Sequence, residues 1–574
     1  MKKFTEKSVR WVIQRIVGRE LLPLPRRGGE DLGERTITAG QHTFPQPFTL
    51  PSPLPKGRGK ANACAGGATC GFISGCLLLF CSVVPISTHA AAATETGRSS
   101  QPVLLPVAND PTVSFRLWFK VGSQDDPAGK EGLAALTAVM LTEAATRKNS
   151  YEQILDRLFP LASGYSALSS VEMTVIAGRT HKDNLADFYP LLLDAVLAPA
   201  FKQEDLDRLK SRTLNLLETT LRFSSDEELG KAVLYNEIFA GTTYGHITPG
   251  TIESVKSITL DDLQKFYTAH FTRDNVVIGL GGGYDAALLA RLQTDLARLP
   301  AGVPAAVPAP MPKAIEGMQV TLVEKNAAST AISMGFPMEV LRGSKDWYAL
   351  AIANSWLGEH RNSSGRLYNV IREARGLNYG DYTYIENFPG GGQRFVPPQN
   401  VARRQQIFEI WIRPVPHDAR HFALRAGLRE FKQLVDHGLT PAEFALKRNF
   451  LKKYVLQYAT TTDERLGYAL DDVFYGLGES HLAKFLRMMD ELTVEDVNAA
   501  IRKHWQFGNL KIAIVTQGAA AFADALAADA PSPITYTSPK PDAVMEEDKA
   551  ITTFPLKIKR ENVRIVPVTD LFVK

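Results

Sequence analysis

The feature that most constrains the fold is an internal duplication. Ile258–Gly283 (ITLDDLQKFYTAHFTRDNVVIGLGGG) aligns without a gap with Leu492–Gln517 (LTVEDVNAAIRKHWQFGNLKIAIVTQ) at a shift of 234 residues. Each segment has a threonine followed by acidic residues, which predicts an N-capped helix, and then an apolar β-branched run, which predicts a strand. A period this long is not that of a solenoid, so we expect two copies of one domain.

Two further segment pairs support the duplication. Ser224–Gly230 (SSDEELG) matches Thr461–Gly467 (TTDERLG) at a shift of 237, and alternating strands are expected at Val113–Phe119 and Ala331–Phe336. Strands and helices are interspersed without strict βαβ alternation. We therefore predict an α+β fold with two homologous domains, each a mainly antiparallel sheet covered by helices.

The expected boundaries follow from composition. A run of Pro and Ala (PAGVPAAVPAPMP) separates the two copies and predicts a linker. The expected parts are a non-conforming extension (1–55, consistent with a start codon assigned too far upstream), a signal peptide (56–93), an N-terminal domain (94–299), the linker (300–316), a C-terminal domain (317–540) and a tail (541–574).

The signal peptide is predicted from its three-part pattern. Lys56, Arg58 and Lys60 precede the apolar run Gly71–Ile86, and small residues follow at 88–93. The apolar run is short for a spanning helix. We expect export to a bacterial periplasm, with an uncleaved membrane anchor as the alternative.

Charge and cysteine content exclude several functions for the mature chain. Residues 1–93 hold 12 Lys/Arg and 5 Asp/Glu, whereas the rest holds 53 and 56, so a nucleic-acid partner has no electrostatic support. All four cysteines precede residue 94. The mature chain therefore has no disulfide framework, cysteine-ligated zinc or cysteine nucleophile.

Several short motifs carry a family resemblance over about residues 100–540. They include VGS at 121–123, GLA at 132–134, YG at 244–245, and REARGLNY at 372–379. With the duplication, these motifs resemble the pitrilysin/insulinase family of zinc metallopeptidases, whose relatives include mitochondrial processing peptidase. The resemblance implies two domains that form a clam-like cleft.

The family's zinc motif, H-x-x-E-H on the helix after GLA, is missing. The resemblance aligns its three functional positions with Ala135, Ala138 and Val139, none of which can bind a metal or transfer a proton. Glu218 lies near the family's third ligand position, but without both histidines we assign it no such role. We expect no metal and no cofactor in this chain, and zinc in a partner subunit.

One other histidine pair has ligand spacing. His417 and His421 form an H-x-x-x-H pattern, which on a helix could grip a metal. Pro414 and Pro416 place this pattern at a helix start, so we interpret Asp418 as a first-turn acid rather than part of a metal site.

The resemblance places an Arg and a Tyr, seven residues apart in the second domain, across the cleft from the zinc. Arg372 and Tyr379 have this spacing, with Arg375 and Tyr382 as candidates if the register slips. A guanidinium can bind a peptide carbonyl in two places, and a phenol can donate to an oxyanion. The alternative is a surface pair of Arg372 with Glu373 or Glu386, and a Tyr379 packed in a strand.

These expectations define three functional hypotheses. The first is a non-zinc subunit that supplies Arg372 and Tyr379 to a zinc-bearing homologous partner in hydrolysis of unfolded peptides, inactive alone. The second is a structural or peptide-binding scaffold of the same fold. The third is an autonomous metalloprotease that uses His417 and His421. The Gly-rich segment Phe388–Pro398 is expected to be a flexible surface loop.

Overall fold

The computed structural model describes residues 101–574. The predicted extension (1–55), the signal peptide (56–93) and the four cysteines lie outside these described residues.

The duplicated helix–strand unit is present in both halves. Helix α9 (Leu260–His270) and helix α16 (Val494–His504) begin after Thr259 and Thr493, whose hydroxyl groups each accept a hydrogen bond from the third residue of the helix. The acids at that third position bond back to the threonine amides, which completes two equivalent capping boxes. Each helix leads into a buried strand, so the alignment at a shift of 234 residues is confirmed.

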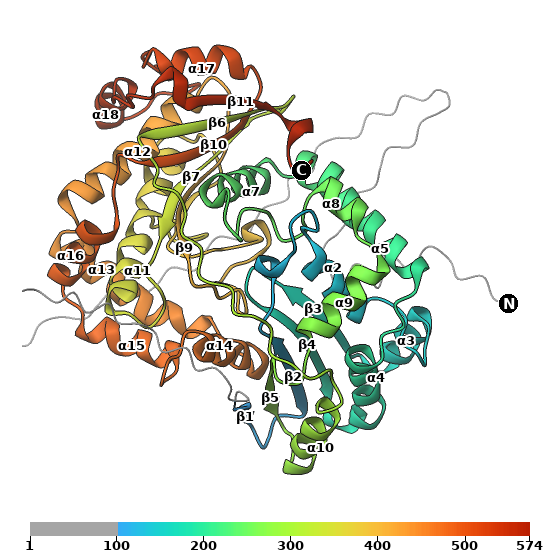
Figure 1. The fold of residues 1–574 in the computed structure, drawn as a ribbon. Coiled ribbons are helices and arrows are strands. Elements are labelled where there is room, and N and C mark those ends of the chain that lie inside the picture. Colours follow the sequence, from blue (N-terminus) through green and yellow to red (C-terminus); the bar gives the residue numbers. More distant parts are fainter. Residues whose placement is uncertain (1–100) are drawn as a thin grey trace, which may run out of the picture. The chain divides into compact units, whose positions relative to one another are not determined.

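The first half is built on a five-stranded mixed sheet (Figure 1). Its order is β1-β5-β2-β4-β3, and only β1 and β5 are parallel. The strands are β1 (Val103–Pro106), β2 (Thr112–Phe119), β3 (Gly164–Ser169), β4 (Thr174–His181) and β5 (Val276–Gly282). The helices of this half, besides α9, are α2 (Leu133–Thr142), α3 (Tyr151–Leu158), α4 (Leu185–Leu197), α5 (Gln203–Asn215), α6 (Leu221–Phe223), α7 (Asp226–Phe239), α8 (Ile252–Ser257) and α10 (Ala286–Leu296).

The second half is built on a six-stranded mixed sheet. Its order is β11-β6-β10-β7-β9-β8, with β11 and β10 both parallel to β6. The strands are β6 (Met318–Glu324), β7 (Thr330–Met338), β8 (Asp381–Tyr384), β9 (Gln406–Val415), β10 (Leu510–Thr516) and β11 (Val563–Pro567). The helices, besides α16, are α11 (Lys345–Gly358), α12 (Arg420–His437), α13 (Pro441–Tyr454), α14 (Thr462–Phe474), α15 (His481–Glu491), α17 (Ala519–Ala527) and α18 (Asp542–Thr552). The α+β fold with two helix-covered sheets is confirmed.

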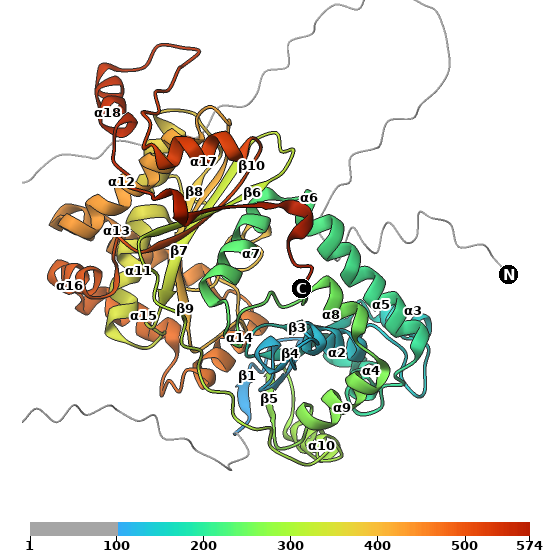
Figure 2. The same ribbon diagram turned by 45° about the horizontal axis from the view of Figure 1, so that its top comes forward.

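The two halves exchange one helix each. Helix α7 of the first half packs on β7 and β10 of the second sheet, and helix α14 of the second half packs on β5 and β1 of the first sheet (Figures 1 and 2). These are the two helices that follow the matched SSDEELG and TTDERLG segments. Each sheet is therefore covered on one face by a helix from the other half.

Glycines permit this close packing. A Cβ atom at Gly230 of α7 would lie 3.3 Å from the Ser333 hydroxyl of β7, and one at Gly279 of β5 would lie 3.3 Å from Leu470 of α14. Leu470 is fully buried in a small cluster with Trp118 and Val277 of the first sheet. Each exchanged helix thus adds buried apolar side chains to the sheet of the other half.

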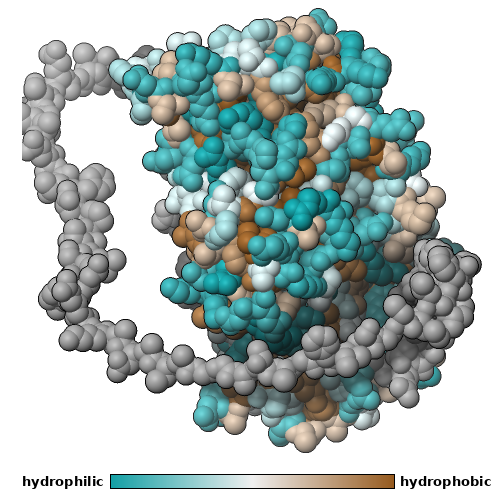
Figure 3. Space-filling view, turned by 90° about the vertical axis from the view of Figure 1, so that its left-hand side faces the viewer, coloured by the Kyte–Doolittle hydropathy of each residue, from teal (hydrophilic) through white to brown (hydrophobic). Residues whose placement is uncertain are grey.

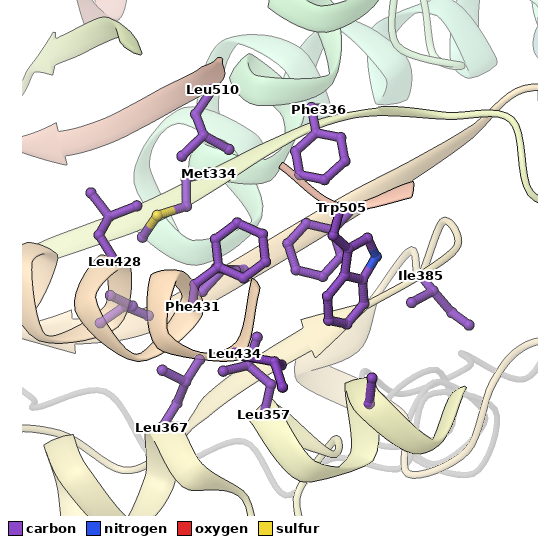
Figure 4. Packing of buried hydrophobic residues seen from close by; sticks show 14 of the residues in the cluster. Met334, Phe336, Leu357, Leu367, Ile385, Leu428, Phe431, Leu434, Trp505 and Leu510 are labelled. Atoms are coloured by element: carbon purple, nitrogen blue, oxygen red, sulfur yellow. The ribbon is translucent and has the colours of Figure 1, made fainter. Parts of the chain in front are cut away.

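The largest hydrophobic core lies in the second half, on the other face of its sheet. Met334 and Phe336 of β7 meet Phe431 of α12 and Trp505, which follows α16 (Figure 4). Leu357 of α11 closes the same cluster. The face of the molecule on which α13, α15 and α16 lie is mostly hydrophilic, and its hydrophobic residues form small separate patches (Figure 3).

The predicted linker and tail differ in structure. Residues 300–316 form no helix or strand. In the tail, α18 packs on α12, and β11 is an edge strand of the second sheet. The last residues reach the first half, where the amides of Ile252 and Glu253 donate to the carbonyls of Phe572 and Val573 at 2.8 and 2.9 Å.

Candidate functional site

The helix expected to carry the zinc motif is α2, and its start is tightly fixed. Gly132, in the left-handed conformation at φ +95°, precedes the helix. The carboxylate of Asp126 accepts hydrogen bonds from the amides of Gly132 and Ala134, both at 2.7 Å. This carboxylate is buried, which raises its pKa well above the usual value. Asp126 and Gly132 thus fix the start of α2.

The positions that would hold zinc are filled by packing. Ala138 is fully buried, and Ala135 and Val139 are partly buried, with Val139 against the apolar core of the first half. None of the three side chains has a lone pair or a proton to give, so these residues do not fit a zinc ion. Residues 101–574 contain no group of three or more His, Cys, Asp or Glu side chains placed to hold a metal.

Glu218 is a surface acid in a π-helical turn, Leu216–Thr220. Its carboxylate pairs with the ammonium group of Lys256 at 3.2 Å, and both side chains are about half exposed. This is an ordinary solvated ion pair on the surface.

The His417–His421 pair has its own partners. His417 lies before α12, and its two ring nitrogens bond to the Thr330 hydroxyl and the Ala327 carbonyl, each at 2.8 Å. His421 is buried on the ring of Phe522, with 5.7 Å between ring centres, and burial lowers its pKa to about 4. The expectation that the pair sits at a helix start is confirmed.

Arg372 and Tyr379 flank a chain reversal. Arg372 lies near the end of a π-helical segment, Tyr368–Glu373, labelled η5. The chain turns at Gly376, which has φ +73° and whose amide donates to the Arg372 carbonyl at 2.7 Å. Tyr379 follows, just before edge strand β8, and is 80% exposed. Both residues are thus held by backbone geometry.

The surface-pair account of these residues is wrong. Glu386 pairs with Arg342 at 2.6 Å, and no ion pair to Arg372 is present in the described part of the chain. The guanidinium of Arg372 lies over the ring of Tyr368 at 5.8 Å. Tyr379 does not pack within a strand. Within residues 101–574, neither side chain has an ion pair, and the contact of Arg372 with the Tyr368 ring leaves its N–H groups available to a ligand.

The register-slip candidates have structural roles instead. The Arg375 guanidinium is buried and pairs with Glu547 at 2.9 Å and Asp548 at 2.8 Å, both on α18. Tyr382 is buried on β8 against Trp411, with 5.8 Å between ring centres. Arg375 therefore links its segment to α18, and Tyr382 packs in the core beside β9.

The Gly-rich segment is an anchored loop, so the expectation of a free flexible loop misses its contacts. Lys231 of α7 donates to the Phe388 carbonyl at 2.9 Å, and Glu228 of α7 accepts from the Gly392 amide at 3.2 Å. His360 bonds to the Arg394 carbonyl at 2.9 Å. The loop thus joins the exchanged helix of the first half to the second half. Sequence patterns give no sign of these long-range partners.

A cavity beneath this loop, lined by aromatic rings and a few charged side chains, was also missed. Glu359 and His360 line it, together with Arg342 and several aromatic rings. Burial raises the pKa of Glu359 to about 7 and lowers that of His360 to about 4, so both are held near or in their neutral forms. The adjacent Glu-His pair at the end of the apolar segment of α11 was the available signal.

Family profiles match most of the described chain. Residues 103–247 match the profile described as Insulinase (Peptidase family M16), and residues 257–451 match the one described as Peptidase M16 inactive domain. An uncharacterized zinc protease of Mycobacterium tuberculosis is 25% identical over 72% of this chain and 91% of its own length. The non-peptidase homolog YmxG of Helicobacter pylori is 22% identical over 75% and 95%.

Solved structures give the same fold. A peptidase M16 inactive domain from Pseudomonas fluorescens is 25% identical, has a TM-score of 0.62, and covers 72% of this chain and 94% of its own. A chain of complex III2 from Candida albicans is 18% identical with a TM-score of 0.57, over 72% and 92%. In the described residues, every helix is too short or too polar to cross a membrane.

Proposed function

Because the chain belongs to the insulinase family (peptidase family M16), we propose that it is a family subunit without hydrolytic activity of its own. It lends Arg372 and Tyr379 to a zinc-bearing relative that cleaves unfolded peptides. The proposal rests on the contrast between the lost zinc positions and the Arg372–Tyr379 pair. The zinc positions on α2 hold alanines and a valine, while Tyr379 is 80% exposed and Arg372 has no carboxylate partner among residues 101–574.

The two side chains suit the proposed task chemically. Arg372 can hold a peptide carbonyl with two parallel hydrogen bonds. Tyr379 can donate to the oxyanion that develops on the scissile carbonyl in the partner's site. Zinc in the partner subunit would activate the water that attacks the peptide carbonyl. In this proposal the two subunits meet in the periplasm, which the signal pattern before residue 94 supports.

A second candidate is a scaffold that binds peptides or subunits without assisting cleavage. It is favoured by two descriptions among the relatives: the matching profile is an inactive domain, and one relative is called a non-peptidase homolog. An exposed Tyr379 argues against it, since a scaffold has no need of an unpartnered phenol before an edge strand.

Reconstitution distinguishes the candidates. The mature chain is purified alone and then mixed with the zinc-bearing relative from the same cell, and peptide cleavage is followed. We expect no cleavage by the chain alone and a clear gain on mixing. Tyr379→Phe should lower the rate of the mixture about 100-fold or more, the usual cost of losing one oxyanion donor.

The controls separate chemistry from folding. Arg372→Ala should reduce the rate as well, whereas Arg502→Ala, an exposed arginine on α16, should leave it unchanged. Tyr379→Phe should not shift the denaturation midpoint because the side chain is mostly in water. Full activity of both site variants would favour the scaffold.

A further inference from the structure

The cavity under the Gly-rich loop is lined by residues of the second half, and Tyr379 is not among them. It measures about 60 Å³, taken as the space open to the centres of water molecules. By that measure one water needs at least about 10–15 Å³, so the cavity holds roughly four waters or one small organic ion. Phe395 of the loop lines it and is 67% exposed, which places its route to solvent on the loop side.

Aromatic rings form a large part of the wall. They include Trp347 of α11, Tyr384 of β8, Phe388 of the loop, Tyr458, Tyr468 of α14 and Phe485 of α15. Aromatic faces carry partial negative charge and attract cations. Walls of this kind are typical of sites for organic ammonium ions.

The cavity also holds polar atoms without partners. The indole nitrogen of Trp347 and the side-chain oxygen of Asn354 are buried and make no hydrogen bond to any described residue. Glu359 is 92% buried, and it forms no ion pair within residues 101–574. Glu359 already accepts a hydrogen bond from the His360 amide, and the Trp347 N–H needs an acceptor, but the Asn354 oxygen needs a donor, which an ammonium ion supplies and an apolar ligand does not.

The nearby cations are already committed elsewhere. Lys447, whose charge acts on Glu359, donates to the carbonyl and hydroxyl of Ser364, both at 2.8 Å. Arg342 pairs with Glu386 at 2.6 Å and Asp471 at 3.3 Å, and lies over the ring of Tyr468 at 5.5 Å. One end of the cavity therefore already combines a cation, a carboxylate and a ring.

At Glu359 the cavity has a carboxylate and neighbouring aromatic rings, but no cation is paired with that carboxylate within residues 101–574. We propose that the cavity binds an organic ammonium ion, with Glu359 as its counter-ion and the aromatic rings as its walls. The ammonium comes either from a free small amine or from the side chain of a lysine. An anion does not fit, because Glu359 lines the space without an ion-pair partner among residues 101–574, whereas the Arg342 guanidinium that also lines it is already paired with Glu386 and Asp471.

The site should respond to pH in a defined direction. An ammonium ion favours the ionised form of Glu359, whose pKa burial raises to about 7. The affinity should therefore rise about tenfold between pH 6 and pH 8. His360, with a pKa of about 4, stays neutral over this range, as does His481, whose pKa burial lowers.

The test uses the purified full chain and calorimetric titration with n-butylammonium, with 1-butanol as the uncharged analogue of the same shape. We expect saturable binding of the amine and at least tenfold weaker binding of the alcohol. Glu359→Gln should weaken amine binding at least tenfold, and Glu491→Gln, a half-exposed acid on α15, should not change it.

A second variant keeps the test decisive if Glu359→Gln fails to fold. Trp347→Phe leaves an aromatic ring in the wall and removes the unpartnered N–H. Because Glu359 is untouched, amine binding should persist with its pH dependence intact. A lysine peptide and its ε-acetylated form separate the two sources: only binding of the unacetylated peptide assigns the site to a lysine side chain. No saturable binding, equal binding of butanol, or unaltered affinity in Glu359→Gln would overturn the proposal.

Discussion

The helix exchange makes a quantitative prediction for Leu470. This side chain belongs to the second half but is fully buried against the first sheet, next to Gly279 of β5. Leu470→Ala removes three carbon atoms, worth about 2.4 kcal/mol at about 0.8 kcal/mol each. The cavity left between rigid elements adds about 1 kcal/mol or more, so we expect a loss of about 3–4 kcal/mol.

Val473, three residues further along α14, is the matched control. Its side chain is 42% exposed, so Val473→Ala should cost less than about 1 kcal/mol. Guanidinium denaturation of the full chain gives the free energy of unfolding for both variants. Amide hydrogen exchange gives the location of the effect, because β5 should exchange faster in Leu470→Ala although it lies almost 200 residues away in sequence.

The outcome that refutes the reasoning is specific. If Leu470→Ala costs no more than Val473→Ala, α14 is not packed on the first sheet. If it costs 3–4 kcal/mol but protection is lost only within the second half, the helix is buried against its own sheet and there is no exchange.

Three further predictions concern other parts of the chain. Burial lowers the pKa of His421 to about 4 from an unfolded value of about 6.5, so on acidification the unfolded chain binds the proton first. The chain should therefore lose about 3 kcal/mol of stability between pH 6.5 and pH 4. His421→Leu should flatten this part of the stability–pH curve, and an identical curve would contradict the assignment. Gly132→Ala combines a strained positive φ with a Cβ placed 2.5 Å from the Pro249 carbonyl, and should cost about 1–2 kcal/mol more than Gly129→Ala, which has positive φ but open space, by thermal unfolding. Zinc uptake, measured by elemental analysis after dialysis, should be the same in the parent chain and in a His417→Ala/His421→Ala variant, and a drop of one equivalent would restore the metal hypothesis.

Local signals in the sequence predicted local structure well. The threonine caps at Thr259 and Thr493 and the strand after each helix are where the pattern put them, because capping and alternation depend on neighbouring residues.

Long-range partners could not be predicted from one sequence. An amphipathic pattern tells which face of α14 is buried but not which sheet buries it. The same limit applies to Lys231 and Glu228, whose partners are backbone atoms about 160 residues away. Arg372 and Tyr379 remain a prediction from resemblance, since their proposed task depends on a second protein.

The exchange of helices also fixes an order of events during synthesis. The first sheet is complete once Gly282 has left the ribosome, but α14, which covers part of it, ends at Phe474. For the time needed to translate almost 200 codons, an apolar face of the nascent chain has no cover. At about 5–20 residues per second this exposure lasts roughly 10–40 seconds, long enough for a chaperone to bind.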